Sequence, residues 1–459
     1  MSRLISNRWA AAAVIAMMVG TAGCSKEGGW QPTGFNSALS FEVYTVDEAT
    51  GEASLVGTTP CDPPLKIPQG QQWYVIPLNP VDMHKIKEEV LVKRIPGLAL
   101  SHATDDHLAN LEDLTSLRFL SLVSANITDA GLPHLKNLTN LQVLLLGRTN
   151  VTDAGLALLK DLTSLQVLGL GETGVTHIER AGLRNLTNLQ RLYLHDTKVT
   201  DEGLTGMNDL RALREVSLSY TKVTDAGLEH LRGLMDLRDL DLTSTEVTDA
   251  GVEQVTGFVG LQRLDLSLTG VTNAGLAHLK VLKNLKALRL DYTGVANAGL
   301  AHLKGLTALR QLGLDHTAVT DAGLEHLKGL AALEMLDLSY TDITDIGLEY
   351  LTSLTNLQEL SLVRTKITDT GLGHLQSLKR LQELGLSNTT VTDAGFAYLK
   401  DFTNLQRVSL GHTGITDEAI ANLTDHSGLQ ELDLQVIYVV NEKQASAPVE
   451  VGGTVYRCF

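Results

Sequence analysis

The pattern of apolar and polar residues repeats at a fixed interval along most of the chain. One unit, residues 141–164, reads LQVLLLGRTNVTDAGLALLKDLTS. Leu144 and Leu146 alternate with outward positions at a period of two, which predicts a short strand. The later leucines of the unit recur every third position, which predicts a helical turn. Each unit therefore predicts one strand followed by one short helix.

A threonine marks the same place in successive units, and every step between these threonines has the same length, without an insertion. Ala125, Ser101 and Ile437 keep the same phase beyond the two ends of the series. One strand and one helix cannot bury their apolar faces alone, so the units must stack to make a core. The threonines are Thr149, Thr173, Thr197, Thr221, Thr245, Thr269, Thr293, Thr317, Thr341, Thr365, Thr389 and Thr413.

The consensus unit, LxxLxLxxTxVTDAGLxxLxxLxx, resembles the leucine-rich-repeat family over residues 96–436, with threonine in place of the usual asparagine. Its VTDAGLxxL half is similar to the repeats of F-box-type receptors, although no F-box is visible. The resemblance implies an α/β leucine-rich-repeat solenoid (a horseshoe), with a concave parallel β-sheet and short helices on the convex side. We expect about fifteen parallel strands between Leu98 and Leu434.

Polar positions within the unit indicate how each turn is held. Thr152 is placed to cap the helix, Asp153 puts negative charge at its amino end, and Lys160 puts positive charge near its carboxyl end. The hydroxyl of Thr149 and its equivalents is expected to donate to a carbonyl of the next turn, which predicts an internal ladder.

One unit departs from the consensus. Thr173 is followed by GVTHIERAGLRNL, which puts Arg180 where a leucine belongs and moves Ala-Gly-Leu by three positions. We expect a bulge or an altered helix here, with Ile178 filling the vacated space.

The segments on either side of the repeats predict small caps. Residues 24–95 form a β-rich module: strand-like runs between 34 and 77 are divided by turn residues and resemble PEGA-type β-domains of exported bacterial proteins. An amphipathic helix over 83–93 would lead into the first repeat strand and cover the open end of the solenoid. Residues 437–459 are predicted to form a capping hairpin.

The segment 1–23 is typical of an export signal peptide. Arg3 and Arg8 make a positive start, and the apolar run over 10–19 is too short to span a bilayer.

The run ends in Thr-Ala-Gly-Cys24, which resembles the lipobox of bacterial lipoproteins, in which the cysteine is lipidated and becomes the new amino terminus. Thr21 replaces the usual leucine, so ordinary cleavage after a small residue is the alternative. With Ser25 next, the resemblance implies an exported protein of the cell envelope, anchored through a lipid on Cys24 in the outer membrane or periplasm.

Composition limits the partners. The chain has 459 residues, and 43% of them are hydrophobic, which is enough to bury a long core. Its formal net charge is −16, and this acidic surface disfavours binding to nucleic acid. Its cysteines, Cys24, Cys61 and Cys458, exclude a disulfide-rich scaffold and have no metal-ligand spacing. Because Cys61 and Cys458 lie at opposite ends of the array, we expect no disulfide between them within one molecule.

The sequence gives little support for a catalytic site or a metal site. No nucleophile elbow, P-loop, dinucleotide-binding glycine motif or HExxH is present. A histidine column on the predicted helices occupies places where other units have Leu, Gln or Tyr, so it is a repeated surface position rather than a metal site. We therefore expect no catalytic residues, no cofactor and no enzyme. The column is His230, His278, His302, His326 and His374.

The concave face carries the candidate binding residues, which come from the positions just before each repeat threonine. Tyrosine and arginine are enriched at interface hot spots, and acids run beside them. This predicts a non-enzymatic scaffold that binds a protein or peptide; the alternative is an adhesive, polysaccharide-binding structural protein in which the rings stack on sugars. The predicted ligand-binding residues are Tyr220, Asp241, Asp265, Arg289, Asp291, Tyr292, Asp315, His316, Asp337, Tyr340 and Arg364.

Overall fold

The computed structural model describes residues 35–46, 53–67, 71–78, 82–179, 182–416, 418–419, 431–433, 449–451 and 454–456. The predicted signal peptide with Cys24, as well as Arg180 and Cys458, lies outside these residues. The chain forms two compact units: residues 1–222 with 230–236, and residues 223–229 with 237–459. Each is described separately.

The first unit begins with three strands where the sequence predicts strand-like runs. Strand β1 (Phe41–Val46) pairs antiparallel with both β2 (Ala53–Thr58) and β3 (Gln72–Pro77). The predicted helix is confirmed as α2 (Met83–Lys93), which buries Met83, Ile86 and Val90. Strand β3 also pairs in parallel with the first repeat strand, β4 (Gly97–Ala99). The amino-terminal strands therefore continue the repeat sheet rather than forming a separate β-domain.

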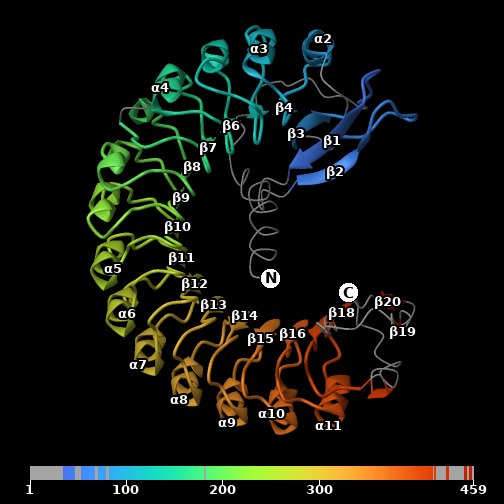
Figure 1. Cartoon of the computed structure of the whole chain (residues 1–459), viewed down its shortest axis with the longest axis vertical. Coiled ribbons are helices and arrows are strands. Elements are labelled where there is room, and N and C mark those ends of the chain that lie inside the picture. Colours follow the sequence, from blue (N-terminus) through green and yellow to red (C-terminus); the bar gives the residue numbers. More distant parts are fainter. Residues whose placement is uncertain are drawn as a thin grey trace, which may run out of the picture. The chain divides into compact units, whose positions relative to one another are not determined.

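The repeats of the first unit add parallel strands in register, so that equivalent residues of successive repeats pair, such as Leu144 with Leu168. Their strands line the inner side and their helices the outer side (Figure 1). The strands that follow β4 are β5 (Phe119–Ser121), β6 (Val143–Leu145), β7 (Val167–Gly169), β8 (Arg191–Tyr193) and β9 (Glu215–Ser217), and the α-helices are α3 (Asp105–Leu108) and α4 (Asp153–Leu156).

The second unit repeats the arrangement with longer runs of α-helix. Its strands are β10 (Asp239–Asp241), β11 (Arg263–Asp265), β12 (Ala287–Arg289), β13 (Gln311–Gly313), β14 (Met335–Asp337), β15 (Glu359–Ser361), β16 (Glu383–Gly385), β17 (Arg407–Ser409) and β18 (Glu431–Asp433). Its helices are α5 (Asp249–Val255), α6 (Asn273–Leu279), α7 (Asn297–Leu300), α8 (Asp321–Leu324), α9 (Asp345–Leu348), α10 (Asp369–His374) and α11 (Asp393–Phe396). Strands β19 (Val449–Val451) and β20 (Thr454–Tyr456) pair antiparallel.

Within the described residues, the six repeat strands of the first unit and the nine of the second make the fifteen that the sequence predicts. Short 3-10 helices continue or replace the α-helices. They are Ala109–Leu111, Leu132–Leu135, Ala157–Leu159, Leu183–Asn185, Glu202–Leu204, Met207–Asp209, Gly227–Leu231, Ala301–Leu303, Glu325–Leu327, Glu349–Leu351, Leu375–Ser377 and Ala397–Asp401. In the part of the chain that is described, no helix is long and apolar enough to cross a membrane.

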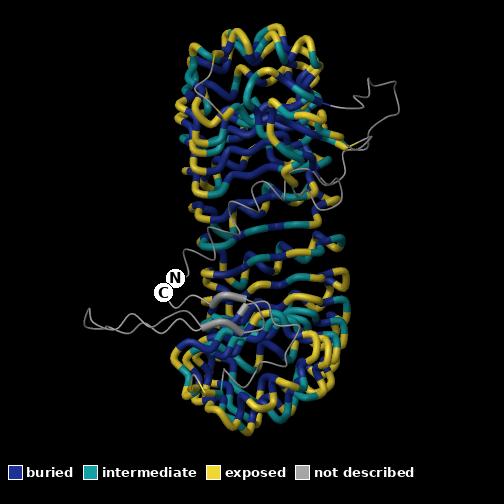
Figure 2. The backbone as a smooth tube through the Cα atoms, turned by 90° about the vertical axis from the view of Figure 1, so that its right-hand side faces the viewer, coloured by how far each residue is buried: buried dark blue, intermediate teal, exposed yellow. Residues whose placement is uncertain are grey.

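Each unit has a continuous aliphatic core. The repeated leucines of strand and helix are almost completely buried, and buried positions run in rows through the stacked turns (Figure 2). Leu144 and Leu146, with Leu156, Leu159 and Leu162 of the same turn, are all 0% exposed. At about 25 cal/mol per Å² of apolar surface, this burial is the main force that holds neighbouring repeats together.

The threonine ladder has a different geometry from the one predicted. The hydroxyl of Thr149 donates to the carbonyl of Leu146 in its own repeat at 2.6 Å, and its equivalents do the same. The expected bond to the next turn is therefore wrong, because the residue before each threonine turns the chain back over its own strand.

Aspartate makes the side-chain bonds between repeats. Asp129 accepts from the backbone N–H of Thr152 at 2.8 Å and from its hydroxyl at 2.6 Å. The oxygen of Thr152 accepts from Ala154 N–H, so the predicted helix cap is confirmed. The sequence had assigned Asp153 only to the helix end, but it accepts in the same way from the next repeat.

The irregular unit lacks an α-helix among its described residues and has only the 3-10 turn Leu183–Asn185, which Gly182 enters at φ 67°. Ile178 is completely buried and its N–H donates to the Gly203 carbonyl at 2.7 Å. The prediction that Ile178 fills the space is therefore confirmed, as is the altered helix.

Candidate functional site

The residue before each repeat threonine has a left-handed backbone. Thirteen consecutive repeats place a non-glycine residue there with φ between 51° and 60°. The N–H of this residue donates to the next repeat; that of Tyr292, for example, donates to the Asp315 carbonyl at 2.8 Å. This conformation lifts the side chain away from the sheet at the carboxyl end of each strand. The residues before the repeat threonines thus form a ridge beside the strands and are not part of the strands themselves.

In the second unit this ridge is an aromatic stack. The ring of His316 lies between those of Tyr292 and Tyr340, with centroid distances of 4.0 and 3.9 Å and interplanar angles of 14° and 20°. The guanidinium of Arg364 lies over the far face of Tyr340, 5.3 Å from its centroid. Tyr292 and Tyr340 remain 42% and 39% exposed, so the stack presents edges and hydroxyls to solvent. We call these four residues the aromatic ridge.

Acidic side chains follow the ridge on the sheet side. Asp265 and Asp337 end β11 and β14, and Asp291 and Asp315 lie in the turns after β12 and β13. Arg289 donates to Asp291 through Nε at 3.0 Å and through a terminal nitrogen at 2.9 Å, and it lies 3.8 Å from Asp265. Asp291 is buried and also accepts from the N–H of Asp315 at 3.0 Å. We call Asp265, Asp291, Asp315 and Asp337 the acidic row.

Crowding of these carboxylates shifts their titration. Burial and the neighbouring Asp241 raise the pKa of Asp265 to about 6, although Arg289 opposes the shift. Burial and Asp337 raise the pKa of Asp315 to about 6, against the hydrogen bond from His316 Nδ1 at 2.7 Å. Burial would lower the pKa of Arg289, but the surrounding carboxylates outweigh it and raise that pKa. The acidic row therefore holds more negative charge than one arginine neutralises.

The structure brings together most of the predicted binding residues. Nine of them make up the aromatic ridge, the acidic row and Arg289, and Asp241 at the end of β10 joins them through its effect on Asp265. Tyr220 belongs to the first unit and is 53% exposed at the same left-handed position.

The first unit carries two features that the sequence pattern did not reveal. Val143, Leu145, Val167 and Tyr193, which alternate with the core leucines, form a buried cluster with strands β1 and β3. A visible signal existed, because apolar residues occupy both faces of β6.

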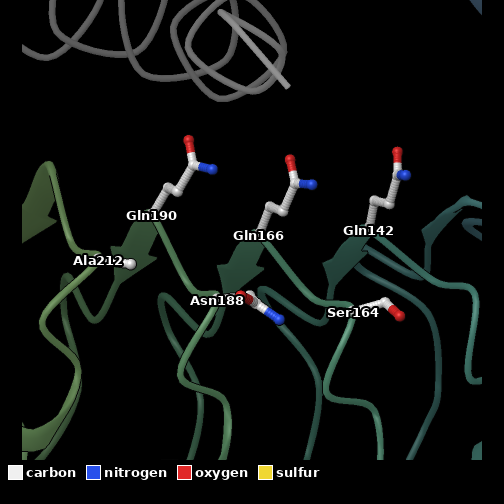
Figure 3. Close-up of a pocket in the computed structure, with 6 residues that line it drawn as sticks. All are labelled: Gln142, Ser164, Gln166, Asn188, Gln190 and Ala212. Atoms are coloured by element: carbon white, nitrogen blue, oxygen red, sulfur yellow. The ribbon is translucent and has the colours of Figure 1, made fainter. Parts of the chain in front are cut away.

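The second feature is a shallow depression of about 380 Å³ lined by Gln142, Gln166 and Gln190 with Ser164, Asn188 and Ala212. The three glutamines precede β6, β7 and β8, and their amides project side by side in the same direction (Figure 3). Their recurrence at the same place in successive repeats is visible in the sequence, but only the columns nearer the threonine were predicted to bind a ligand.

Among the described residues, no group of His, Cys, Asp or Glu side chains could hold a metal ion. The acidic row contacts Arg289 and the backbone N–H of Asp315, and its arrangement suits recognition of a positively charged surface.

Comparisons with known proteins support the repeat fold. Models of the leucine-rich repeat match residues 331–391 and 233–254. An internalin from Listeria monocytogenes is 26% identical, with a TM-score of 0.53 over 66% of this chain and 82% of that chain. A leucine-rich-repeat protein from Leptospira interrogans is 22% identical, with a TM-score of 0.54 over 75% of this chain and 91% of that chain. None of the curated proteins matches the chain.

The predicted fold class is thus confirmed: the chain is a leucine-rich-repeat solenoid with a parallel sheet and short helices. Such scaffolds are typical of protein-binding proteins and are generally not enzymes.

Proposed function

We propose that the protein is a non-enzymatic binding protein of the cell envelope, and that its second unit recognises a positively charged segment of a protein or peptide. The observation that carries the proposal is the aromatic ridge lying beside the acidic row. Tyrosine and arginine are residue types enriched at binding hot spots, and the adjacent carboxylates favour a cationic partner.

The geometry favours a protein over a polysaccharide at this ridge. Sugar rings bind aromatic side chains by covering an open ring face. Both faces of His316 are covered by tyrosines, and Arg364 covers the outer face of Tyr340, so that among the four residues only the outer face of Tyr292 has no ring or guanidinium over it. The ridge offers edges and hydroxyls instead, which suit hydrogen bonding and side-chain contact with a peptide.

Export and lipid anchoring are supported by the sequence at the amino terminus, residues 1–25. The positive start, the short apolar run and Cys24 in a lipobox-like setting favour export of the mature chain to the envelope, where the solenoid would reach its partner outside the cytoplasm.

The proposal is tested by crosslinking in intact envelopes followed by mass spectrometry. The double variant Tyr292→Ser and Tyr340→Ser should lose the crosslinks made by the wild-type second unit. Tyr398→Ser, an exposed tyrosine on the helix side, is the matched control and should keep them. Raising the salt concentration should weaken the wild-type complex because its charges are partly exposed. A crosslink pattern unchanged by the double variant would contradict the proposal.

A further inference from the structure

A polar stripe crosses the first unit at the position just before each strand. Gln142, Gln166 and Gln190 occupy three successive repeats, and arginines occupy the same position in the repeats on either side, at Arg118 and Arg214. The three amides stand parallel on neighbouring turns and line the shallow depression (Figure 3). We call these five residues the amide stripe. It is a row of neutral amides with a cation at each end.

The backbone holds the stripe rigidly. The carbonyl of Gln142 accepts from the N–H groups of Gln166 at 2.8 Å and Val167 at 3.0 Å. The carbonyl of Gln166 accepts in the same way from Gln190 and Arg191, at 2.8 and 3.0 Å. Each side chain therefore starts from a fixed point, and neighbouring points are separated by the strand spacing of about 4.8 Å.

Among the described residues, the five side chains of the stripe form no hydrogen bond or ion pair; only their backbone groups are hydrogen-bonded. The same column in the second unit is different at its centre. Lys286 Nζ donates to Gln262 Oε1 at 3.0 Å, and Arg310 pairs with Glu334 at 2.8 Å. The side-chain donors and acceptors of the stripe are thus available to a ligand. In the second unit, part of the equivalent column is paired with itself.

We propose that the amide stripe binds a linear acidic polysaccharide, with uronate carboxylates held by Arg118 and Arg214 and sugar hydroxyls held by the three amides. An amide both donates and accepts, and so does a hydroxyl, which makes the two complementary. A guanidinium binds a carboxylate with two parallel hydrogen bonds. The site is distinct from the aromatic ridge and acidic row, which select positive charge.

The spacing favours a glycan over an extended acidic peptide. Four strand steps of about 4.8 Å separate the two arginines by about 19 Å along the sheet. Sugar rings of a β-linked chain succeed one another at a distance close to one strand step, so each amide meets a new ring. In an extended peptide, side chains on the same face are about 6.7 Å apart, because only every second residue points that way. This spacing does not match the spacing of the amides.

The test uses the full chain and calorimetric titration with a β-1,4-linked mannuronate oligosaccharide of about six sugars, long enough to span the stripe. A neutral β-1,4-linked mannose oligosaccharide of the same length and a glutamate oligopeptide are the comparison ligands. The wild type should bind the mannuronate chain and bind the neutral chain at least about tenfold more weakly, because each lost charge-assisted bond costs at least that factor.

Two sets of variants separate the amides from the charges. Arg118→Gln with Arg214→Gln should remove the preference for the acidic chain, and Gln142→Met, Gln166→Met and Gln190→Met together should weaken both sugars about tenfold or more. The matched control replaces Gln358, Gln382 and Gln406, three glutamines in the same column of the second unit, and should leave binding unchanged.

Three outcomes would overturn the inference. They are an absence of mannuronate binding by a folded wild type, binding that the stripe variants do not change, and tighter binding of the glutamate peptide than of the sugar.

Discussion

Single residues in this chain adopt strained conformations because the repeat requires them. A left-handed backbone costs a residue with a Cβ about 1–2 kcal/mol, and glycine or asparagine tolerates it best. Asn388 occupies such a position, but Leu268, Tyr292 and His316 do so too. The sequence showed which residues fill this column. It could not show that their φ is positive, because none of them is a glycine, and it therefore placed the column on the sheet.

Leu268→Asn should stabilise the protein by about 1 kcal/mol, since asparagine accepts the left-handed backbone with less strain. Leu268 has φ 57° and is 44% exposed, so little packing is lost. Urea denaturation followed by circular dichroism would show a higher midpoint. Leu268→Ala is the control: alanine lacks the short polar side chain that hydrogen-bonds locally in the left-handed conformation, and it should give no gain. An equal gain from alanine would mean that backbone strain is not the cause.

Asp265→Asn should also stabilise the protein at pH 7.5, by about 2 kcal/mol, because the carboxylate is desolvated beside Asp241. Its pKa is about 6 in the folded protein, above the ordinary 3.8. The folded state therefore binds the proton more tightly, and wild-type stability falls as pH rises through 6.

The gain from this substitution should shrink to about half at pH 5, where much of the wild-type carboxyl is protonated when folded. Parallel urea titrations at the two pH values measure it. A gain that is the same or larger at pH 5 would show that the charge of Asp265 is not what destabilises the folded state.

At the scale of the element, periodicity was sufficient to predict strand, helix and register. The leucine positions alone determine that Leu144 pairs with Leu168, and the structure agrees. The partners of the polar side chains were harder to predict, because a hydroxyl can reach several carbonyls. Only the folded turn shows that Thr149 bonds within its repeat while aspartate bonds to the next.

Asp321→Ala should destabilise the second unit by about 2–3 kcal/mol, since Thr344 loses partners for its N–H and its hydroxyl, at 2.8 and 2.6 Å. Asp321→Asn should cost less than about 1 kcal/mol. The chain itself supplies the precedent: Asn297 accepts from the Thr320 N–H and donates to its hydroxyl, both at 2.8 Å. Thermal and urea unfolding of the two variants measure the difference. Equal losses would mean that the ladder bonds are not the source.

At the scale of the whole molecule, repetition made the fold predictable from the sequence. The binding site could be predicted only in part. A repeated core position has one physical requirement, burial, and its residue type is nearly constant. A binding column has no such constraint, so the sequence could gather its residues but not show that Tyr292, His316 and Tyr340 stack. The amide stripe was missed for the same reason, because a column that mixes glutamine, arginine and lysine is also what an unselected surface position would show.

Attachment to the membrane depends on a single residue in our proposal. The proposed anchor is a lipid on Cys24, which ends the lipobox-like sequence Thr-Ala-Gly-Cys. Cys24→Ala removes the thiol that would carry the lipid, and the protein should move from the membrane pellet to the soluble fraction after cell disruption. Acyl chains contribute about 0.8 kcal/mol per buried methylene, so their loss abolishes anchoring rather than weakening it.

Cys61→Ala is the matched control, because Cys61 is a free thiol in the connection between β2 and β3 and its loss should leave the protein in the pellet. A mass increase on the amino-terminal peptide of the wild type, absent from Cys24→Ala, would identify the modification directly. If Cys24→Ala stays with the membrane after a high-salt wash, which removes electrostatic attachment, the anchor lies elsewhere and the lipobox interpretation is wrong.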